Sequence, residues 1–331
     1  MKNYDVYGIG NALVDTEYAV SDRFLSDAGV AKGLMTLIEE NERQVLIKTL
    51  LDHQLAPVKQ AGGGSAANTM VAIAQLSGSA FYSCKVANDD TGAFFVKDLI
   101  AAGVDTNLGP EREDGATGVC LSMVTPDAER SMTTCLGITN FLSTNELNPE
   151  ALAQSARLYI EGYLVSSVTG FQAALEAQKI AKANNVIVSL TLSDPAMVEI
   201  FSENYRQLLE QGVDLLFCNH DEARLLTGQD SVQECIAALK KICPAFVITC
   251  GSKGSIAFDG ETEHWAQGVP VTAVDTTGAG DIFAGTFLYS IANNRGFDEA
   301  NKLANRAASQ LVGRFGARLT AEEVETLIRD S

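Results

Sequence analysis

The sequence has few cationic residues for its length. Its 331 residues include 24 Lys and Arg against 42 Asp and Glu, which gives a formal net charge of -18. Because the cations are scattered without runs, and because so acidic a chain repels polyphosphate backbones, nucleic-acid binding is not expected. Any anionic ligand therefore has to be held locally, by backbone N–H groups and a few cations.

Histidine is also scarce, and the cysteines lack a recognisable pattern. Three histidines and seven cysteines are present, with no C-x-x-C spacing, so neither a zinc site nor a disulfide framework is indicated. Several cysteines lie in apolar runs such as Leu215-Leu-Phe-Cys218, which favours buried thiols in a reducing cytosol.

Long apolar runs and a signal peptide are missing as well. No apolar run approaches the roughly 20 residues of a membrane span, and the opening segment Met1-Lys-Asn-Tyr-Asp5 has no succession of cationic, apolar and small residues. We therefore expect a cytoplasmic protein with no membrane partner.

Two common nucleotide-binding motifs are absent. No G-x-x-x-x-G-K-[ST] string occurs, which disfavours a P-loop kinase. The run Gly8-Ile-Gly10-Asn-Ala-Leu13 has Leu13 where the dinucleotide-binding motif needs its third glycine, and no helical run follows. A dinucleotide site is therefore not expected there.

The chain does contain alternating strand-like and helix-like segments, which predict a central, mostly parallel sheet flanked by helices. Candidate strands are 80–86, 157–160, 186–190, 213–217 and 245–249. Candidate helices are 65–76, 91–102, 170–183 and 231–241, followed by a long helix after Gly278 and another after Phe297.

Two regions interrupt this alternation. Residues 12–50 carry short alternating pieces around a small helix beginning at Ser21, and residues 116–136 read as a hairpin around Thr125-Pro-Asp-Ala-Glu129. They predict a small β-rich lid of 12–50 with 116–136, over a large α/β domain of 1–11, 51–115 and 137–331; additional edge strands are the alternative. We hypothesise that this lid closes over substrate, which identical lid positions in crystals with and without substrate would contradict.

The segment Asp275-Thr-Thr-Gly-Ala-Gly-Asp281 lies between a strand-like run, 269–274, and a helix-like run, 282–292. Glycines at a helix start allow close approach of a ligand, and the unpaired first-turn N–H groups attract an anion. The alternative is purely structural, with Thr277 as N-cap and Asp281 as an acidic first-turn residue.

This string strongly resembles the C-terminal signature of the ribokinase-like (PfkB) carbohydrate and nucleoside kinases. The resemblance implies an ATP-dependent kinase with a ribokinase-like α/β fold. In that family the final Asp, here Asp281, takes the proton of the accepting hydroxyl, and the Gly278, Ala279 and Gly280 amides form an anion hole for the transferring phosphoryl group.

Two N-terminal segments carry the same resemblance. Gly10-Asn-Ala-Leu-Val-Asp15 is similar to the family's first substrate segment, in which Asn11 and Asp15 would bind acceptor hydroxyls. Gly62-Gly-Gly-Ser-Ala-Ala-Asn-Thr69 is similar to its second, which implies Gly63, Gly64 and Asn68 as substrate contacts. A turn aspartate and a glycine loop are the structural alternatives.

Further motifs resemble the family's nucleotide side. Asn219-His-Asp-Glu222 is similar to N-x-x-E, which implies that Asn219 and Glu222 organise Mg²⁺ and phosphate, with Glu222 acting through water. The same residues also fit a capping box, and the two roles are compatible. The resemblance leaves activation by a monovalent cation open.

A second nucleotide motif follows a later strand. Thr249-Cys-Gly-Ser-Lys-Gly254 resembles the family's T-x-G-x-x-G loop, in which Thr249, Gly251 and Gly254 would approach ATP. Asn305 matches a position that often faces adenine.

The lid candidates suggest the substrate. Lys32-Gly-Leu-Met-Thr-Leu-Ile38 is apolar, and Arg130 matches a residue that reaches the transferring phosphate in relatives. An apolar slot suits a purine nucleoside better than a free sugar, unless these residues form a small core beneath the lid. The chain most resembles the adenosine kinase branch. A kinase for ribose, fructose or a keto-deoxy sugar acid, and a non-catalytic nucleoside-binding protein, stay open, as does the choice between monomer and homodimer.

Overall fold

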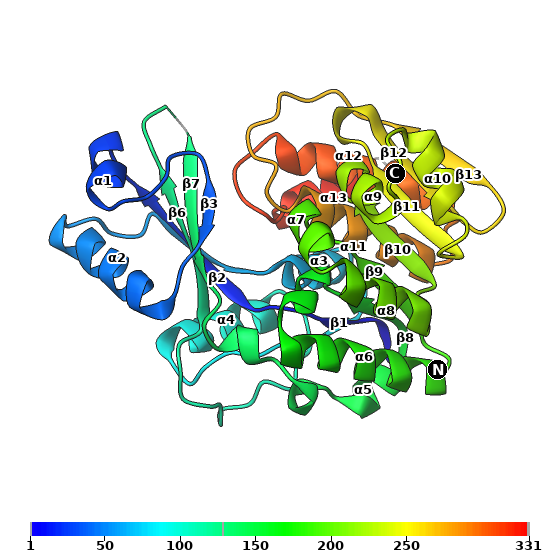
Figure 1. The fold of residues 1–331 in the computed structure, drawn as a ribbon, viewed down its shortest axis with the longest axis horizontal. Coiled ribbons are helices and arrows are strands. Elements are labelled where there is room, and N and C mark those ends of the chain that lie inside the picture. The colour runs from blue at the N-terminus through cyan, green and yellow to red at the C-terminus, as the bar shows by residue number, and fades with distance from the viewer. Residues whose placement is uncertain (1, 128, 330–331) are drawn as a thin grey trace.

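The computed structural model describes residues 2–127 and 129–329 and contains two sheets (Figure 1). The large sheet has eight strands in the order β13-β12-β11-β10-β9-β8-β1-β5, of which β11 to β5 run parallel and β12 and β13 are antiparallel. Its strands are β1 (Tyr4–Ile9), β5 (Ala80–Ser83), β8 (Ser155–Ile160), β9 (Ile187–Thr191), β10 (Leu215–Asn219), β11 (Ala245–Thr249), β12 (Gly254–Phe258) and β13 (Glu263–Gln267).

Helices cover both faces of the large sheet, which confirms the predicted α/β fold (Figure 1). Four of these helices pack against one another in succession: α3 (Ser65–Gln75), α11 (Ala279–Ala292), α12 (Phe297–Val312) and α13 (Ala321–Arg329). The remaining helices of this domain are α4 (Asp90–Ala101), α5 (Pro149–Ala153), α6 (Val168–Ala183), α7 (Pro195–Ile200), α8 (Ser202–Gly212), α9 (His220–Thr227) and α10 (Val232–Leu239).

The second sheet has five strands in the order β3-β7-β6-β2-β4. Its strands are β2 (Leu13–Ala19), β3 (Met35–Leu37), β4 (Lys59–Gly63), β6 (Gly118–Val124) and β7 (Arg130–Cys135). Helices α1 (Asp22–Asp27) and α2 (Glu40–Asp52) lie on its outer side (Figure 1). The predicted hairpin is therefore present as the antiparallel pair β6 and β7, and residue 128, between them in the sequence, is outside the described residues.

Three details differ from the sequence expectations. Residues 269–274 form no strand: Val269, Val271 and Val274 are 41–46% exposed, and the run connects β13 to α11 without a neighbouring strand to pair with. Helix α2 was not expected: it follows the alternating piece at 32–38, in a region where the sequence predicted only one small helix, beginning at Ser21. Finally, β4 pairs with β2, so residues 59–63 belong to the small sheet rather than to the large domain, where the boundary at residue 50 placed them.

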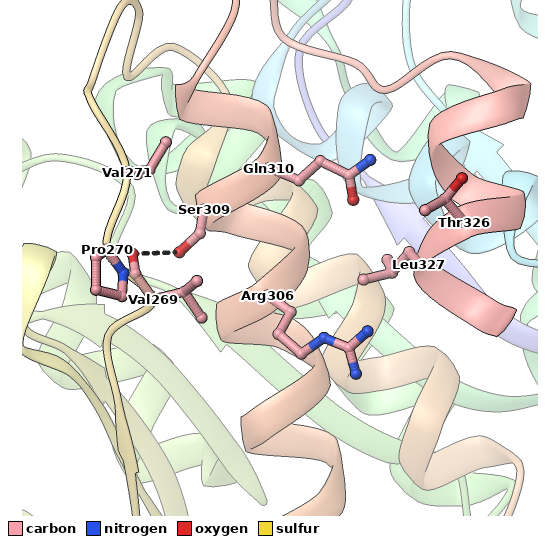
Figure 2. A pocket seen from close by; sticks show the side chains of 8 residues that line it. All are labelled: Val269, Pro270, Val271, Arg306, Ser309, Gln310, Thr326 and Leu327. Atoms are coloured by element: carbon pink, nitrogen blue, oxygen red, sulfur yellow. Dashed lines mark hydrogen bonds between the residues drawn. The ribbon is translucent and has the colours of Figure 1, made fainter. Parts of the chain in front are cut away.

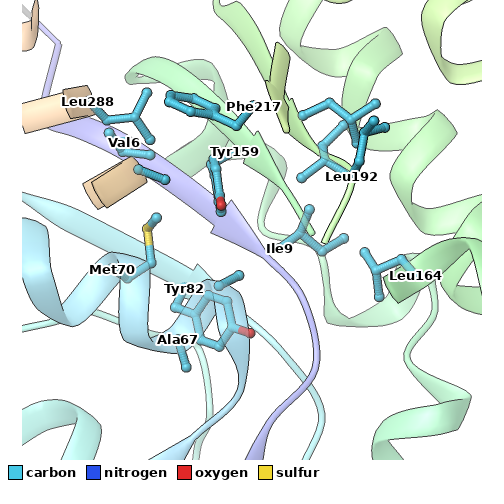
Figure 3. Close-up of a cluster of buried hydrophobic side chains, with 14 of the residues drawn as sticks. Val6, Ile9, Ala67, Met70, Tyr82, Tyr159, Leu164, Leu192, Phe217 and Leu288 are labelled. Atoms are coloured by element: carbon cyan, nitrogen blue, oxygen red, sulfur yellow. The ribbon is translucent and has the colours of Figure 1, made fainter. Parts of the chain in front are cut away.

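The core of the large domain is continuous across the sheet and its helices. Figure 3 shows Val6 and Ile9 of β1 and Tyr159 of β8 beside Met70 of α3 and Leu288 of α11. All lie among the buried residues of one cluster. Because α3 and α11 both pack on this core, their N-terminal ends are held in fixed positions relative to each other.

Phe287 is the aromatic centre of the α11 contact. Its ring is fully buried. The centroid of that ring lies 5.7 Å from the ring centroid of Phe217 of β10, 6.3 Å from that of Phe283 and 5.1 Å from that of Phe297. Phe287→Ala should lower the free energy of unfolding by about 3–5 kcal/mol, because the ring's contacts are replaced by a cavity. Urea denaturation measures this, with Val168→Ala at an exposed position as the control; a loss below about 1 kcal/mol would contradict the packing.

Candidate active site

The start of α11 is shaped by Gly278. This residue is the N-cap and has φ of +78°, and a Cβ built on it would lie 2.7–2.8 Å from atoms of Ala317. Only glycine fits both constraints. The structural alternative that made Thr277 the N-cap is therefore wrong, because the helix begins one residue later, at Ala279.

Two first-turn amides of α11 are available to a ligand. Within the described residues, the backbone N–H groups of Gly280 and Asp281 make no hydrogen bond, whereas that of Ala279 donates to the Thr276 carbonyl at 3.2 Å. A Cβ built on Gly280 would meet nothing within 4 Å, so the space beside it is open. The helix dipole adds positive potential at this point, which suits an anion.

The Asp281 carboxylate faces the N-terminal end of α3. Ser65 Oγ donates to Oδ1 at 2.6 Å, and Asn68 Nδ2 donates to Oδ2 at 3.2 Å. Burial raises the pKa of Asp281 to about 6, an effect that the two donors oppose and the neighbouring Asp15 carboxylate increases. The group is therefore a base whose affinity for a proton is well above that of an exposed aspartate.

The loop before α3 packs closely on the first substrate segment. Gly64 has φ of +101°, and a Cβ built there would lie 2.3 Å from the Asn11 carbonyl oxygen. Glu161 joins the two segments: it accepts hydrogen bonds from the Asn11 backbone at 3.2 Å, from Asn11 Nδ2 at 2.9 Å and from the Ala66 backbone at 2.8 Å. Burial raises the pKa of Glu161 to about 7.

Asp15 lies on β2, against the end of β4. A Cβ built on Gly63 would lie 2.5 Å from its Oδ2, so the absence of a side chain there makes room for the carboxylate. Burial raises the pKa of Asp15 to about 6, opposed by Arg318 and Arg130. The structure therefore brings Asp15, Asn68 and Asp281 together, from three elements distant in sequence.

Arg130 of β7 reaches across from the small sheet. It forms an ion pair with Asp275, and its Nε donates to Ser122 Oγ at 3.1 Å. Asp275 also accepts from the backbone of Thr277 and of Gly316, both at 3.0 Å. The arginine is thus engaged by the loop that precedes Asp281.

The nucleotide motifs surround a separate cavity of about 630 Å³. It is lined by Asn219, His220, Asp221, Val232, Gln233, Thr249, Cys250, Gly251, Lys253, Ser255, Ile256 and Trp265. Of the predicted nucleotide residues, Asn219, Thr249 and Gly251 line it directly. Gly254 does not; it has φ of +98°, and a Cβ there would lie 2.0 Å from the Ala266 carbonyl, so strand packing alone requires a glycine.

Glu222 and Asn305 do not line this cavity but contact residues that do. Glu222 accepts from the Asn219 backbone and from Asn219 Nδ2, both at 2.8 Å, and its own N–H donates to Asn219 Oδ1, which completes the expected capping box. Asn305 donates to Ser255 Oγ and, at 2.9 Å, to the Asn301 carbonyl, so it orients the lining residue Ser255.

The donor set fits a hydrated cation better than a directly bound one. Both oxygens of Glu222 already accept hydrogen bonds, and burial raises its pKa to about 7. Over residues 2–127 and 129–329, no group of three His, Cys, Asp or Glu side chains is arranged to hold a metal ion. Mg²⁺ usually keeps several waters and relies on substrate phosphates, so this arrangement is compatible with it.

A second, smaller cavity of about 250 Å³ lies between the 269–271 connection, α12 and α13 (Figure 2). Ser309 Oγ donates to the Val269 carbonyl at 3.3 Å beside it. None of the predicted site residues lines this cavity.

Three residues around Asp281 were not predicted from the sequence. Ser65 lies inside the Gly62–Thr69 motif, and Glu161 directly follows β8, at the carboxyl end of a parallel strand where ligands commonly bind. Both positions gave a signal that sequence reasoning could have used. Arg318 lies in an irregular segment after α12 and gave none.

Comparison with known proteins identifies the family. The model of the pfkB family carbohydrate kinases matches residues 34–324. The chain belongs to the PfkB family. It is therefore a kinase with an alcohol group as acceptor, and the family implies ATP as phosphate donor, usually with Mg²⁺.

Several members of the PfkB family are similar to this chain over most of its length. The adenosine kinase from Sinorhizobium meliloti is 35% identical, with a TM-score of 0.87 over 99% of both chains. A probable sugar kinase protein from Rhizobium etli CFN 42 is 32% identical, with a TM-score of 0.88 over 100% of this chain and 99% of that one. Ribokinase from Haemophilus influenzae is 30% identical over 77% of this chain and 82% of its own length.

Within the part of the chain that the structure describes, no helix of this PfkB protein is long and apolar enough to cross a membrane. The family acts on small-molecule substrates.

The Asp281 carboxyl should titrate near pH 6 in the folded protein. Ser65→Ala should raise its pKa further, because Ser65 donates a hydrogen bond to the ionised form. Infrared spectroscopy with ¹³C-labelled aspartate, referenced to Asp281→Asn, measures the midpoint. Ser309→Ala, whose hydroxyl lies at the smaller cavity, should leave it unchanged; a wild-type midpoint near 4 would contradict the burial.

Proposed function

We propose that this PfkB protein transfers the γ-phosphoryl group of ATP to the 5′-hydroxyl of a purine nucleoside, as an adenosine kinase does. The observation that carries the proposal is the Asp281 carboxylate, held by Ser65 and Asn68 beside the two unpaired amides at the start of α11. A base and an anion site thus lie within one helical turn.

In the proposed reaction Asp281 accepts the proton of the 5′-hydroxyl as its oxygen attacks the γ-phosphorus, and ADP leaves. Ser65 and Asn68 hold the carboxylate in one orientation, which leaves its remaining lone pairs for the acceptor. The raised pKa favours proton acceptance near neutral pH. The Gly280 and Asp281 amides would stabilise charge on the transferring group, and Gly278 and Ala279 set their direction.

The acceptor side is proposed to bind the ribose through Asp15, Asn11 and Asn68. A charged carboxylate accepts hydroxyl hydrogen bonds worth about 1.5–3 kcal/mol each, which suits the vicinal hydroxyls of a ribose. Gly63 and Gly64 would let the backbone approach the sugar.

The small sheet offers apolar side chains on the face that carries Asp15. Asp15 pairs with Cys120, Cys120 with Thr134, and Thr134 with Leu37, so these side chains share one face of the sheet. Met35, two residues before Leu37, shares that face too. Met35 and Leu37 are 51% and 59% exposed, so they are not a buried core, and a flat purine would cover them favourably.

A sugar kinase is the second candidate, since ribokinase and a sugar kinase protein are about as similar to the chain as an adenosine kinase is. It would use the same base and amides. The exposed apolar side chains favour the nucleoside, because a free sugar would place hydroxyls there without partners.

The ATP donor is proposed to occupy the cavity at Asn219, Thr249 and Gly251, with Asn305 holding the lining residue Ser255 and Gly254 allowing β12 to pack against β13. Bound Mg²⁺ would neutralise charge on the β- and γ-phosphates. Glu222, fixed by Asn219, would hold the water shell of that ion.

The small sheet is proposed to act as the lid, with 12–50 and 116–136 as its expected parts and β4 added. The Arg130–Asp275 ion pair joins β7 to the loop before Asp281, so the sheet's position is linked to the phosphoryl site. Closure would keep water from the γ-phosphate.

Asp281→Asn should fold but lose turnover by roughly 10²- to 10⁴-fold, because an amide cannot accept the proton. In the wild type, turnover should fall as pH drops through about 6, since protonation removes the base. A coupled assay of ADP formation across pH measures both. Asp298→Asn, on α12, is the control, because its side chain is 47% exposed and pairs, among the described residues, only with Lys302 of the same helix. Near wild-type turnover in Asp281→Asn would refute the assignment.

A panel of adenosine, inosine, guanosine, ribose, fructose and a keto-deoxy sugar acid, assayed with ATP and Mg²⁺, tests the acceptor. A purine nucleoside should have the highest kcat/KM. Leu37→Asn should lower that value roughly tenfold or more by weakening the apolar slot, while Leu51→Asn, at an exposed position of α2, should not. Preferential phosphorylation of a free sugar would favour the second candidate, and no ADP formation with any acceptor would favour a binding protein.

A further inference from the structure

Arg318 lies at the centre of a hydrogen-bonded chain that ends on Asp281. Its Nε donates to Asn68 Oδ1 at 2.9 Å, and its Nη1 donates to Asp98 Oδ2 at 2.6 Å. Asp98, on α4, also accepts from the Gly62 backbone of β4 at 3.2 Å. The chain therefore connects the small sheet, α4 and α3 to the carboxylate on α11.

The chemistry of the arginine fixes which way the Asn68 amide faces. A guanidinium can only donate hydrogen bonds, so it must meet the amide oxygen of Asn68. The amide nitrogen is then directed at Asp281 Oδ2, which it contacts at 3.2 Å. Without Arg318 the amide could rotate and present its oxygen to the carboxylate, which would be repulsive.

The position of Arg318 is costly for stability alone. Its side chain is only 16% exposed, and the Nη2 atom is buried without a hydrogen-bond partner among the residues that the structure describes. An unsatisfied buried donor is unfavourable, and the partly buried Arg318–Asp98 ion pair does not remove that cost, because it engages Nη1 and not Nη2. A functional reason for the arginine is therefore indicated.

We propose that Arg318 is a positioning residue that orients the Asp281 base through Asn68 and keeps the base ionised by its positive charge. This inference rests on the proposed phosphoryl transfer. It assigns a part in catalysis to the segment that follows α12.

The charges around Asp281 leave Arg318 as the cation that favours ionisation. Asp15 of β2 raises the pKa of Asp281. The Asp281 charge in turn raises the pKa of Glu161, after β8, and of the neutral tyrosines Tyr82, Tyr159 and Tyr163. Arg318, by contrast, lowers the pKa of both Asp15 and Asp281.

Three variants test the proposal. Arg318→Gln removes the charge, whereas Arg318→Lys keeps it but cannot hold Asn68 and Asp98 together in the same forked geometry. Arg314→Gln is the control: it removes another arginine of the segment after α12, one that pairs with Glu323 of α13. The first readout is the infrared titration of Asp281 in substrate-free protein. The second is the pH dependence of kcat and KM with ATP, Mg²⁺ and the best acceptor of the panel.

Arg318→Gln should raise the Asp281 midpoint by roughly 0.5–1 pH unit, shift the acidic limb of kcat upward equally and lower kcat roughly 10- to 100-fold. Arg318→Lys should restore the midpoint but not the full kcat, and Arg314→Gln should change neither. An unchanged midpoint in folded Arg318→Gln would overturn the proposal, even if kcat fell, because the role would then be only structural.

The proposed function and the proposed role of Arg318 can be contradicted separately. If the wild type phosphorylated no acceptor, the proposed function would be wrong, while the titration of substrate-free Arg318→Gln would still decide whether Arg318 controls Asp281. If the wild type were active and the midpoint did not move, only the role of Arg318 would be wrong.

Discussion

The burial of one carboxylate is the constraint on which the site depends. Asp281 is partly withdrawn from water, which disfavours its charged form, and donors from α3 offset part of that cost. This balance works only if α3 and α11 keep their spacing, which the shared core on β1 and β8 ensures. The fold therefore serves the chemistry by holding two helix N-termini face to face.

Much of the fold could be predicted because periodicity and turn residues report it locally. The parallel strands followed from apolar spacing, and so did helices such as α3, which begins at Ser65, and α6, which ends at Ala183. The valines of 269–274 misled because β-branched composition indicates a strand only where a partner strand exists. Helix α2 was missed because the alternating pieces at 17–20 and 32–38, which precede it, led the whole stretch to be read as β-rich.

The candidate site was predictable as far as its residues fall in compact motifs. Asp281, Asn68 and Asp15 belong to strings whose glycines have a visible purpose, such as Gly64, which leaves room for the Asn11 carbonyl. Glu161 and Arg318 are single residues whose importance comes from what tertiary folding places beside them. No local pattern encodes the contact of Arg318 with Asn68, which spans 250 residues of sequence.

The central claim is that the acceptor oxygen meets Asp281 while the transferring phosphate meets the first turn of α11. A crystal structure with a purine nucleoside and a non-hydrolysable ATP analogue tests this most directly. The account predicts the 5′-oxygen within about 3 Å of an Asp281 carboxylate oxygen and the γ-phosphate at the Gly280 and Asp281 amides. A nucleoside bound with its 5′-oxygen directed away from Asp281 would contradict it.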